Sequence, residues 1–486
     1  MRSDVRIAHT RISAAAVSAL CGIAYVLIAV AQWRALAAPS WDLGIFSQLA
    51  KAYSTASAPI VPIKGEGFNL LGDHFHPLLV LLGPLWWLWP SPLMLLVLQG
   101  LLSAVSAYPL TRLSVERLGH GVGIGLGLAY GLSWGLQFAV QTQFHEIAFA
   151  VPIMAFALVA YLRGNAIGAA LWAGALVFVK EDLGITVAVF GAILALRSPR
   201  RPRLGWGLAA WGLAWTLLAT AVILPALNPE SAYDYTGNVA SLSGLFVPIE
   251  KWITTAMLIG TAGVIGLRSP LVLLMLPTLA WRFAGSVEFY WDWRWHYSAI
   301  LMPIAAAALL DAVSRRRREG DRGTHARGEP ESAAPSGAMV AGGTRTDASE
   351  QRRDRGRIRA VAGIAVGISA LTTLALWSTL PLGTLSRVGA DSPRMPAALA
   401  AIDAVPEGAR VETDLTLMAR LVPHADVYWL GNENPVPDAV VIDADSHVWR
   451  NVDDPDAAQW ASDRHGATFV SVFDGDGFQV ALREGP

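Results

Sequence analysis

Long apolar runs recur along most of this chain, and they constrain its fold more than any other feature. Eleven runs approach or reach the length that an α-helix needs to cross a bilayer. Only 15% of the 486 residues are charged, whereas soluble proteins carry about a quarter. The pattern predicts an all-α polytopic membrane bundle. The expected spans are 12–33, 93–111, 119–140, 146–163, 165–179, 183–197, 204–226, 251–268, 270–283, 296–313 and 360–380.

The first run is predicted to be a retained helix rather than a removed signal peptide. A basic segment, 1–11, precedes it, and no small-residue cleavage site ends it. It contains Cys21, the only cysteine, so an intrachain disulfide is excluded. The Trp-rich segment 77–90, bracketed by prolines, is short for a span and is predicted to be interfacial or re-entrant.

The distribution of charge predicts how the spans are oriented. With the N-terminus in the cytoplasm, 11 of the 18 Lys and Arg residues of 1–313 fall inside, and 11 of the 14 Asp and Glu residues fall outside. This arrangement obeys the positive-inside rule. A full crossing at 77–90 would move Arg200, Arg201 and Arg203 outside, so eleven spans fit better than twelve.

The runs and the segments between them suggest a division into domains. Residues 1–313 are expected to form the membrane domain, with polar loops on its outer face. Residues 314–358 are rich in Arg, Gly and Ser and are predicted to be a disordered cytoplasmic loop, which is more suited to anionic lipid than to nucleic acid. A last transmembrane helix lies within 359–380, and 391–486 is predicted to be a small extracytoplasmic α/β domain.

The C-terminal domain is expected to alternate short strands with helices. Strands are predicted at 409–412, 426–430, 438–443, 467–473 and 478–482, helices near 415–421 and 456–465, and a hairpin turn at 474–477. The domain has 6 basic and 17 acidic residues, a balance of 6 − 17 = −11. Such a charge argues against binding nucleic acid or an anionic membrane surface.

Polar clusters rich in His, carboxylate and aromatic residues gather at the outer ends of the spans. They are Trp41-Asp42, Asp73-His74-Phe75-His76-Pro77, Gln141-Thr142-Gln143-Phe144-His145-Glu146, Lys180-Glu181-Asp182, Tyr233-Asp234-Tyr235 and residues 288–297. Loops are polar in any membrane protein, and Trp and Tyr favour interfaces. Ionisable groups at membrane depth are costly, however, so one-sided clustering favours a site that faces the outer compartment.

Asp42 has two interpretations on spacing alone. Its carboxylate can act as a general base toward a hydroxyl, from a short amphipathic stretch that lies on the outer surface. Alternatively, Asp42 precedes a plausible helix start and caps it. Both interpretations place Asp42 just outside the first span.

Two further groups of residues suit binding rather than proton transfer. His76, His145 and Glu146 have donor atoms that suit a divalent metal, although hydrogen bonding to a polar substrate is the favoured use for them. Lys180 can hold a phosphate as a point charge, or it can pair internally with Glu181 or Asp182. Aromatic residues around Arg294 and His296 suit sugar stacking, with Arg294 holding phosphate, and they also suit an aromatic belt. No phosphate loop, dinucleotide fingerprint or nucleophile elbow appears in the chain.

Four ordered motifs resemble a family of bacterial membrane proteins catalogued as domain of unknown function 2079. They are Trp41-Asp42-Leu43-Gly44-Ile45-Phe46-Ser47-Gln48, Asp73-His74-Phe75-His76-Pro77-Leu78, Gln143-Phe144-His145-Glu146 and Lys180-Glu181-Asp182. The similarity covers roughly residues 30–310. That family in turn looks like the GT-C membrane glycosyltransferases, which have many spans, an acidic first outer loop and often a soluble C-terminal domain. Many of those enzymes carry two acidic residues in this loop, whereas Leu43 follows Asp42 here.

The resemblance implies a glycosyltransferase of the bacterial cytoplasmic membrane that takes its sugar from a polyprenyl-phosphate donor. Asp42 is then the candidate base for inverting transfer to an acceptor hydroxyl on the extracytoplasmic side. The expected substrate-binding residues are His74, His76, Gln143, His145, Glu146, Lys180, Glu181, Asp182, Arg294 and His296. The alternatives are a transporter or lipid-handling protein, which would need polar residues near the midplane, and a sensor or scaffold.

Overall fold

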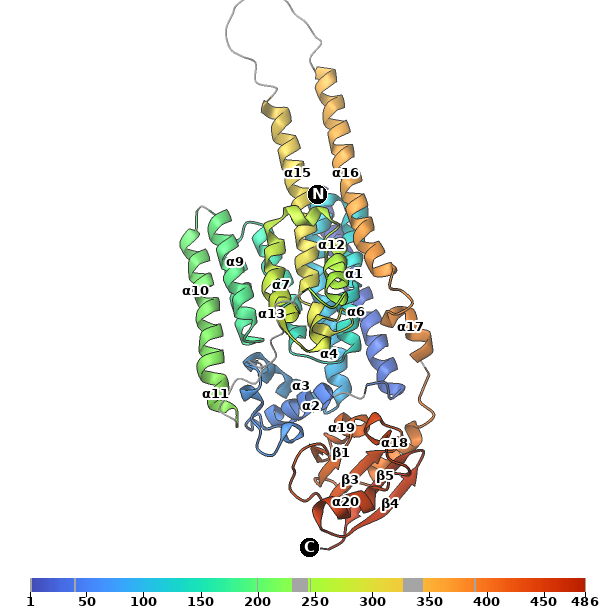
Figure 1. Ribbon diagram of the computed structural model, residues 1–486. Coiled ribbons are helices and arrows are strands. Elements are labelled where there is room, and N and C mark those ends of the chain that lie inside the picture. The colour runs from blue at the N-terminus through green and yellow to red at the C-terminus, as the bar shows by residue number, and fades with distance from the viewer. Residues whose placement is uncertain are drawn as a thin grey trace, which may run out of the picture.

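The computed structural model describes residues 2–38, 41–198, 200–229, 244, 246–326, 344–388 and 390–485. Long helices lie side by side, and a domain with a β-sheet lies at one end of them (Figure 1). The helices before that domain are α1 (Arg2–Arg34), α2 (Trp41–Ser54), α3 (Leu82–Leu88), α4 (Pro92–Leu118), α5 (His120–Gly131), α6 (Trp134–Gln141), α7 (Ile147–Leu162), α8 (Ala166–Gly174), α9 (Leu183–Arg197), α10 (Pro202–Leu218), α11 (Leu224–Leu227), α12 (Glu250–Thr261), α13 (Leu276–Ala284), α14 (Glu288–Trp291), α15 (Leu301–Ala326), α16 (Thr344–Leu374) and α17 (Pro381–Val388).

Every expected span coincides, over most of its length, with one helix or with consecutive helical segments, which confirms the helical bundle. Among the described residues, five helices are long and apolar enough to cross a membrane, or six if the bent pair Glu288–Ser298 and Leu301–Arg316 is one span. The other expected spans are shorter apolar helices such as α7 and α9. The count of eleven spans therefore stays a prediction. So does the placement of 77–90, which forms a short 3-10 turn, Pro77–Leu81, followed by α3.

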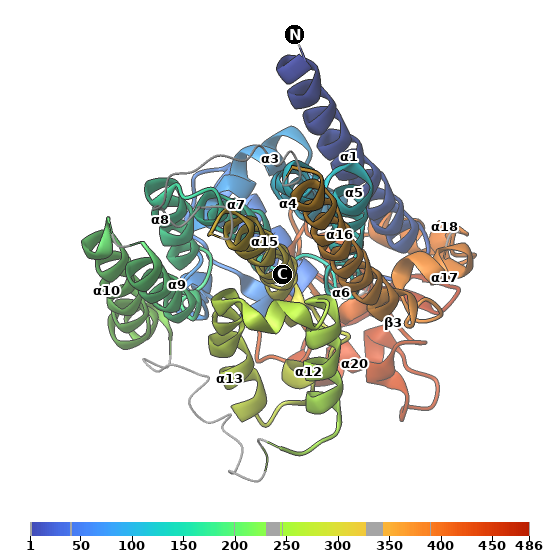
Figure 2. The ribbon, with the colours of Figure 1, turned by 90° about the horizontal axis from the view of Figure 1, so that it is seen from above.

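Helix α15 forms the centre of the bundle, because its residues 301–314 are all buried. Viewed from above, α7, α4, α16 and α12 surround it, whereas α10 lies at one edge and α1 at another (Figure 2). Small residues allow the closest helix contacts. A Cβ atom at Gly100 of α4 would approach the Tyr25 side chain of α1 to 2.9 Å, and the Tyr25 hydroxyl donates a 2.6 Å hydrogen bond to the Gly131 carbonyl.

Apolar side chains also cover outward faces of the bundle. Ile12 and Ile23 of α1 and Trp206, Leu217 and Val222 around α10 are all more than half exposed. A continuous apolar exterior of this kind is unfavourable in water, and it is the surface expected next to lipid.

Part of the predicted cytoplasmic loop is helical. Helix α15 continues to Ala326 and α16 begins at Thr344, while residues 327–343 lie outside the described residues. Ala, Arg and Glu are good helix formers, so the helices continue into a segment whose polar composition predicted a disordered loop. The far ends of α15 and α16 and the start of α1 lie at the end of the bundle opposite the C-terminal domain (Figure 1). Which end faces the cytoplasm remains a prediction.

The C-terminal domain has the predicted alternation of strands and helices. Its elements are α18 (Met395–Asp403), β1 (Arg410–Thr413), α19 (Leu415–Leu421), β2 (Asp426–Trp429), β3 (Ala439–Asp443), α20 (Ala457–His465), β4 (Phe469–Gly475) and β5 (Phe478–Arg483). The sheet order is β2-β1-β3-β5-β4, with β1 parallel to β2 and β3, and with β5 antiparallel to β3 and β4. Asp476 and Gly477 both have positive φ, as a tight hairpin turn requires.

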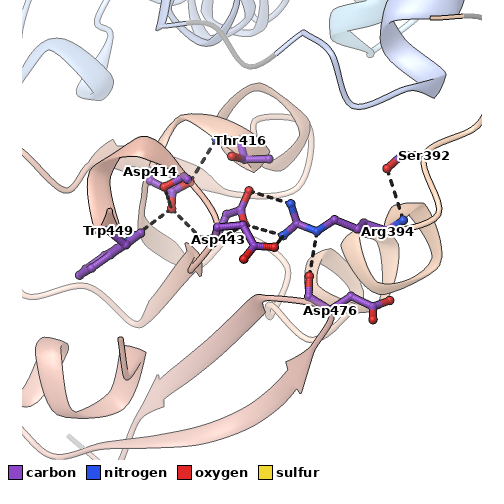
Figure 3. A network of polar contacts seen from close by, with 9 residues as sticks. Ser392, Arg394, Asp414, Thr416, Asp443, Trp449 and Asp476 are labelled. Carbon is purple, nitrogen blue, oxygen red and sulfur yellow. Dashed lines mark hydrogen bonds and ion pairs between the residues drawn. The ribbon is translucent and has the colours of Figure 1, made fainter. Parts of the chain in front are cut away.

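A satisfied polar network holds the carboxyl ends of β1 and β3 together (Figure 3). The Asp414 carboxylate accepts hydrogen bonds from the backbone N–H groups of Thr416 at 3.1 Å and Asp443 at 2.7 Å, and from the Trp449 indole at 3.1 Å. Arg394 forms a 2.5 Å ion pair with the Asp443 carboxylate. The network fixes the start of α19, which packs against α2.

Candidate active site

Helix α2 carries Asp42 and is held between the bundle and the C-terminal domain. Residues 43–50 of this helix are all buried. Gln48 donates to the Val427 carbonyl at 2.7 Å, and the Lys51 ammonium donates to the Val422 and Ala425 carbonyls at 2.9 and 3.0 Å. Trp41 packs edge-on against Trp429 of β2, with ring centroids 4.5 Å apart. The C-terminal domain thus helps to fix where Asp42 lies.

Asp42 lies in the first turn of α2, which begins at Trp41, so it does not precede the helix as the capping interpretation required. Its side chain is 46% exposed, and its Oδ2 lies 3.3 Å from Nε2 of His145, whose side chain is only 7% exposed. A half-exposed carboxylate backed by a buried imidazole is thus present. The negative charge also benefits from the helix N-terminus.

The tautomer of His145 follows from its second contact. Its Nδ1 lies 3.1 Å from the Gln143 carbonyl, so Nδ1 carries the hydrogen and donates it. The Nε2 atom then faces a carboxylate, and this contact is favourable when Nε2 is protonated as well. Burial lowers the pKa of His145, but the Asp42 carboxylate raises it, and the pKa lies above its ordinary value. His145 therefore contacts Asp42 from a buried position, and the Asp42 carboxylate stabilises the protonated form of the imidazole.

Gln99, from the middle of α4, fixes the loop that carries His145. Its amide nitrogen donates to the Ala139 and Gln143 carbonyls at 2.5 and 2.6 Å, and its oxygen accepts from the His145 backbone N–H at 2.8 Å. Gln143 has a φ of +66°, a strained conformation for a residue other than glycine. These bonds compensate for that strain and set the position of the imidazole.

Two other buried imidazoles lie around His145. The His296 ring stacks on it with centroids 3.5 Å apart, and Phe46 of α2 makes edge contacts with both His145 and His76, at 6.2 and 6.1 Å. Burial lowers the pKa of His76 to about 4, so this ring is neutral at pH 7. The Nδ1 atoms of His76 and His296 are buried and meet no hydrogen-bond partner among the described residues.

Buried ion pairs form the floor of the site. The Lys180 ammonium lies 2.6 Å from the Glu146 carboxylate; the Glu146 side chain is buried, and the Lys180 side chain is 15% exposed. Next to them, His74 Nδ1 lies 2.8 Å from the Glu181 carboxylate, which also accepts the Phe75 backbone N–H at 3.0 Å. Each of these charges has a partner of opposite charge, and a charge can be buried in a low-dielectric environment only when it is paired in this way.

The sequence profile of a family described as "Predicted membrane protein (DUF2079)" matches residues 33–468. The chain belongs to this family. All four motifs on which the resemblance rests lie within the matched residues, so that prediction is confirmed. No curated protein matches the chain. Among solved structures, the chain is similar to the crystal structure of ArnT from Cupriavidus metallidurans in the apo state, with 11% identity, a TM-score of 0.49 and coverage of 95% of this chain and 98% of that chain.

In this DUF2079 protein, most of the residues predicted from sequence lie near one another. Asp42, His145 and His296 are linked by direct contacts, and the Lys180–Glu146 pair shares a small cavity with His296 and Asp182. Gln143 acts through its carbonyl rather than its side chain. The cluster Tyr233-Asp234-Tyr235 lies outside the described residues.

Arg294 is engaged elsewhere. Its guanidinium is 58% exposed and pairs at 2.5 Å with Asp292, two residues earlier in the chain. The Arg294 guanidinium donates hydrogen bonds to Asp292, and these bonds, followed by the charges of Asp292, Glu288 and Glu250, raise the pKa of Arg294. None of these carboxylates belongs to the site. A role for Arg294 in binding phosphate remains a prediction, and in that role Arg294 would have to break its ion pair with Asp292.

Sequence reasoning missed two buried polar residues. Gln99 interrupts an apolar run, and an amide at membrane depth is itself a signal of a structural or functional role. Arg282 of α13 is fully buried and donates to the Tyr290 and Asp292 carbonyls and to the Ser298 hydroxyl, at 2.5, 3.3 and 3.2 Å. It therefore holds the segment that leads to His296.

The predicted metal ligands do not gather into a metal site. Within the described ranges, no three His, Cys, Asp or Glu side chains stand close enough to hold an ion. Glu146 is bonded to Lys180 and His145 to Asp42, so the two strongest candidates each have another partner. The chemistry available at the site is that of an acid–base pair.

Proposed function

We propose that this protein transfers a sugar from a polyprenyl-phosphate donor to an acceptor hydroxyl at the outer face of the membrane, with Asp42 as the general base. The observation that carries the proposal is the contact between half-exposed Asp42 and buried His145. Asp42 is accessible to an acceptor, and its contact with His145 orients the carboxylate. A carboxylate in this state can accept the proton that the hydroxyl loses as the glycosidic bond forms.

The surroundings of Asp42 support a lipid-linked donor. The site lies at the ends of α6 and the starts of α2, α7 and α9, beside apolar helices that reach toward lipid. A carrier would bind its substrate near the middle of the spans. Clustering at helix ends therefore favours the transferase over the transporter.

The leaving phosphate needs positive charge as the bond to the sugar breaks. Lys180 is the cation nearest to the imidazole cluster, but it already neutralises Glu146 at 2.6 Å. In the proposed reaction Lys180 shares its three N–H donors between Glu146 and the phosphate, as an ammonium can. His145 contributes a second positive charge from the side of the acceptor.

The test is the Asp42→Asn chain in membranes supplied with polyprenyl-phosphate-linked radiolabelled sugars. Loss of the base is expected to lower the transfer rate by about 10²–10⁴-fold at unchanged protein level. The matched control is Asp391→Asn, since Asp391 forms an exposed ion pair with Arg34 at the same junction. Equal transfer by the Asp42→Asn chain and the native chain would remove Asp42 from the base role.

A further inference from the structure

A small cavity lies beside the stacked imidazoles, and His296 forms part of its wall. Its walls come from the start of α7, the loop before α9, helix α13 and the turn before α15. The polar residues that line it are Glu146, Lys180, Asp182, Trp281, His296 and Tyr297. Its volume of about 20 Å³ suits a single water-sized or hydroxyl-sized group.

Three of the residues that line this cavity carry a buried polar atom without a protein partner. They are Asp182 at Oδ1, Trp281 at Nε1 and His296 at Nδ1, and none of these atoms meets a hydrogen-bond partner within the part of the chain that the structure describes. Leaving a buried donor or acceptor unpaired costs free energy, and folded proteins contain few such atoms. Three unpaired polar atoms on residues around one cavity indicate that a bound polar group forms hydrogen bonds with them.

The size of the cavity and the charges around it limit the kind of group that it holds. Glu146 and Asp182 face one ammonium, Lys180, which is already bonded to Glu146. Burial raises the pKa of Asp182 to about 6, and the nearby Lys180 and Glu181 charges act in opposite directions. A volume of about 20 Å³ is too small for a phosphate group, so the cavity itself suits a neutral group of hydroxyl size, while other N–H groups of Lys180 stay available for phosphate.

A hydroxyl matches the unpaired atoms by type. The carboxylate oxygen of Asp182 accepts a hydrogen bond, the Trp281 indole donates one, and the imidazole nitrogen of His296 does either according to its tautomer. A hydroxyl both donates and accepts, and the rings of Trp281 and Tyr297, which pack edge-to-face with centroids 5.5 Å apart, flank it. A methyl group or hydrogen atom in its place would leave all three atoms unpaired.

We infer that this cavity receives one hydroxyl group of the sugar, and that Asp182, Trp281 and His296 determine which sugars the protein accepts. The inference rests on the proposed function, because it takes the group that enters the cavity to be part of the transferred sugar. His296, stacked on His145, then links recognition of the sugar to the position of Asp42.

The test measures binding and needs no turnover. Purified full chain carrying Asp42→Asn is titrated calorimetrically with short-chain polyprenyl-phosphate hexoses and pentoses, each beside its monodeoxy analogues. For the sugar that binds most tightly, we expect the hydroxyl at one ring position to be required for tight binding. The analogue that lacks this hydroxyl is expected to bind at least about tenfold more weakly, because a site built for a hydroxyl discriminates strongly against a ligand without it. Combining Asp42→Asn with Trp281→Phe keeps an aromatic ring but removes the indole N–H donor. This double variant is expected to lose most of the difference in affinity between the sugar and its deoxy analogue.

The control is Trp206→Phe on the exposed face of α10, which should leave the discrimination intact. Unfolding temperatures of all chains show whether Trp281→Phe is folded, and Asp182→Asn provides a second variant of nearly equal size. If every deoxy analogue binds as its parent does while the native chain transfers sugar, the inference is wrong and the cavity holds an ordered water. If the native chain neither binds nor transfers any of these sugars, the proposed function itself is wrong.

Discussion

Two polar networks in this protein are built from similar residues and differ in how completely they are satisfied. In the C-terminal domain, Asp414 accepts four protein hydrogen bonds and Arg394 pairs with Asp443 (Figure 3). Near Asp42, the described neighbours leave polar atoms of His76, His296 and Asp182 without partners. A fully satisfied network stabilises a fold, whereas an incomplete one keeps capacity for a ligand. The proposal that a sugar binds near Asp42 fits this difference between the two networks.

The largest effect should come from breaking the buried pair beneath the site. Lys180→Met leaves the Glu146 carboxylate buried without its cation, and we expect the free energy of unfolding to fall by about 3–5 kcal/mol. Denaturant titration of the purified full chain in detergent measures this loss. The double variant Lys180→Met with Glu146→Gln, which removes both charges, should recover a large part of it. A midpoint unchanged by Lys180→Met alone would show that water reaches Glu146.

A smaller effect is expected in the satisfied network. Asp414→Asn replaces one acceptor oxygen by an NH₂ group that faces N–H donors, and we expect a loss of about 1–3 kcal/mol in the free energy of unfolding. Sugar binding by folded protein should stay unchanged, because no atom of this network reaches Asp42. The comparison fails if Asp414→Asn alters sugar binding at temperatures where the chain remains folded.

Local sequence patterns predicted the helices and strands well, but they predicted poorly which polar side chains contact one another. Apolar runs gave the helices, and alternation gave all five strands and both helices between them. For Lys180, sequence proximity suggested Glu181 or Asp182, yet its bonded partner is Glu146, 34 residues away. Partner choice depends on how α7 and α9 pack, and no single spacing encodes that. Gln99 shows the same limit, since its three bonds lie 40 to 46 residues along the chain.

The smallest effect is a pH dependence at the edge of the site, where His74 meets Glu181. Burial and Lys180 lower the pKa of His74, but the Glu181 carboxylate and Asp73 raise it, and the net pKa lies above its ordinary value of 6.5. Because the folded chain then binds the proton more tightly than the unfolded chain, this contribution is full below pH 6.5 and is lost as pH rises through the folded pKa. One proton changes the free energy of unfolding by at most about 1.4 kcal/mol per pH unit.

The measurement is the difference in unfolding free energy between the native chain and His74→Gln, followed from about pH 6 to about pH 9, the range around an ordinary histidine pKa. We expect the difference to shrink as pH rises, because glutamine cannot carry the charge that Glu181 stabilises. The same series on His465→Gln serves as a matched control, since His465 pairs with buried Glu412 in the C-terminal domain at the same 2.8 Å. A flat difference for His74→Gln would mean that His74 is neutral beside Glu181, and that the floor of the site carries one positive charge fewer than its contacts indicate.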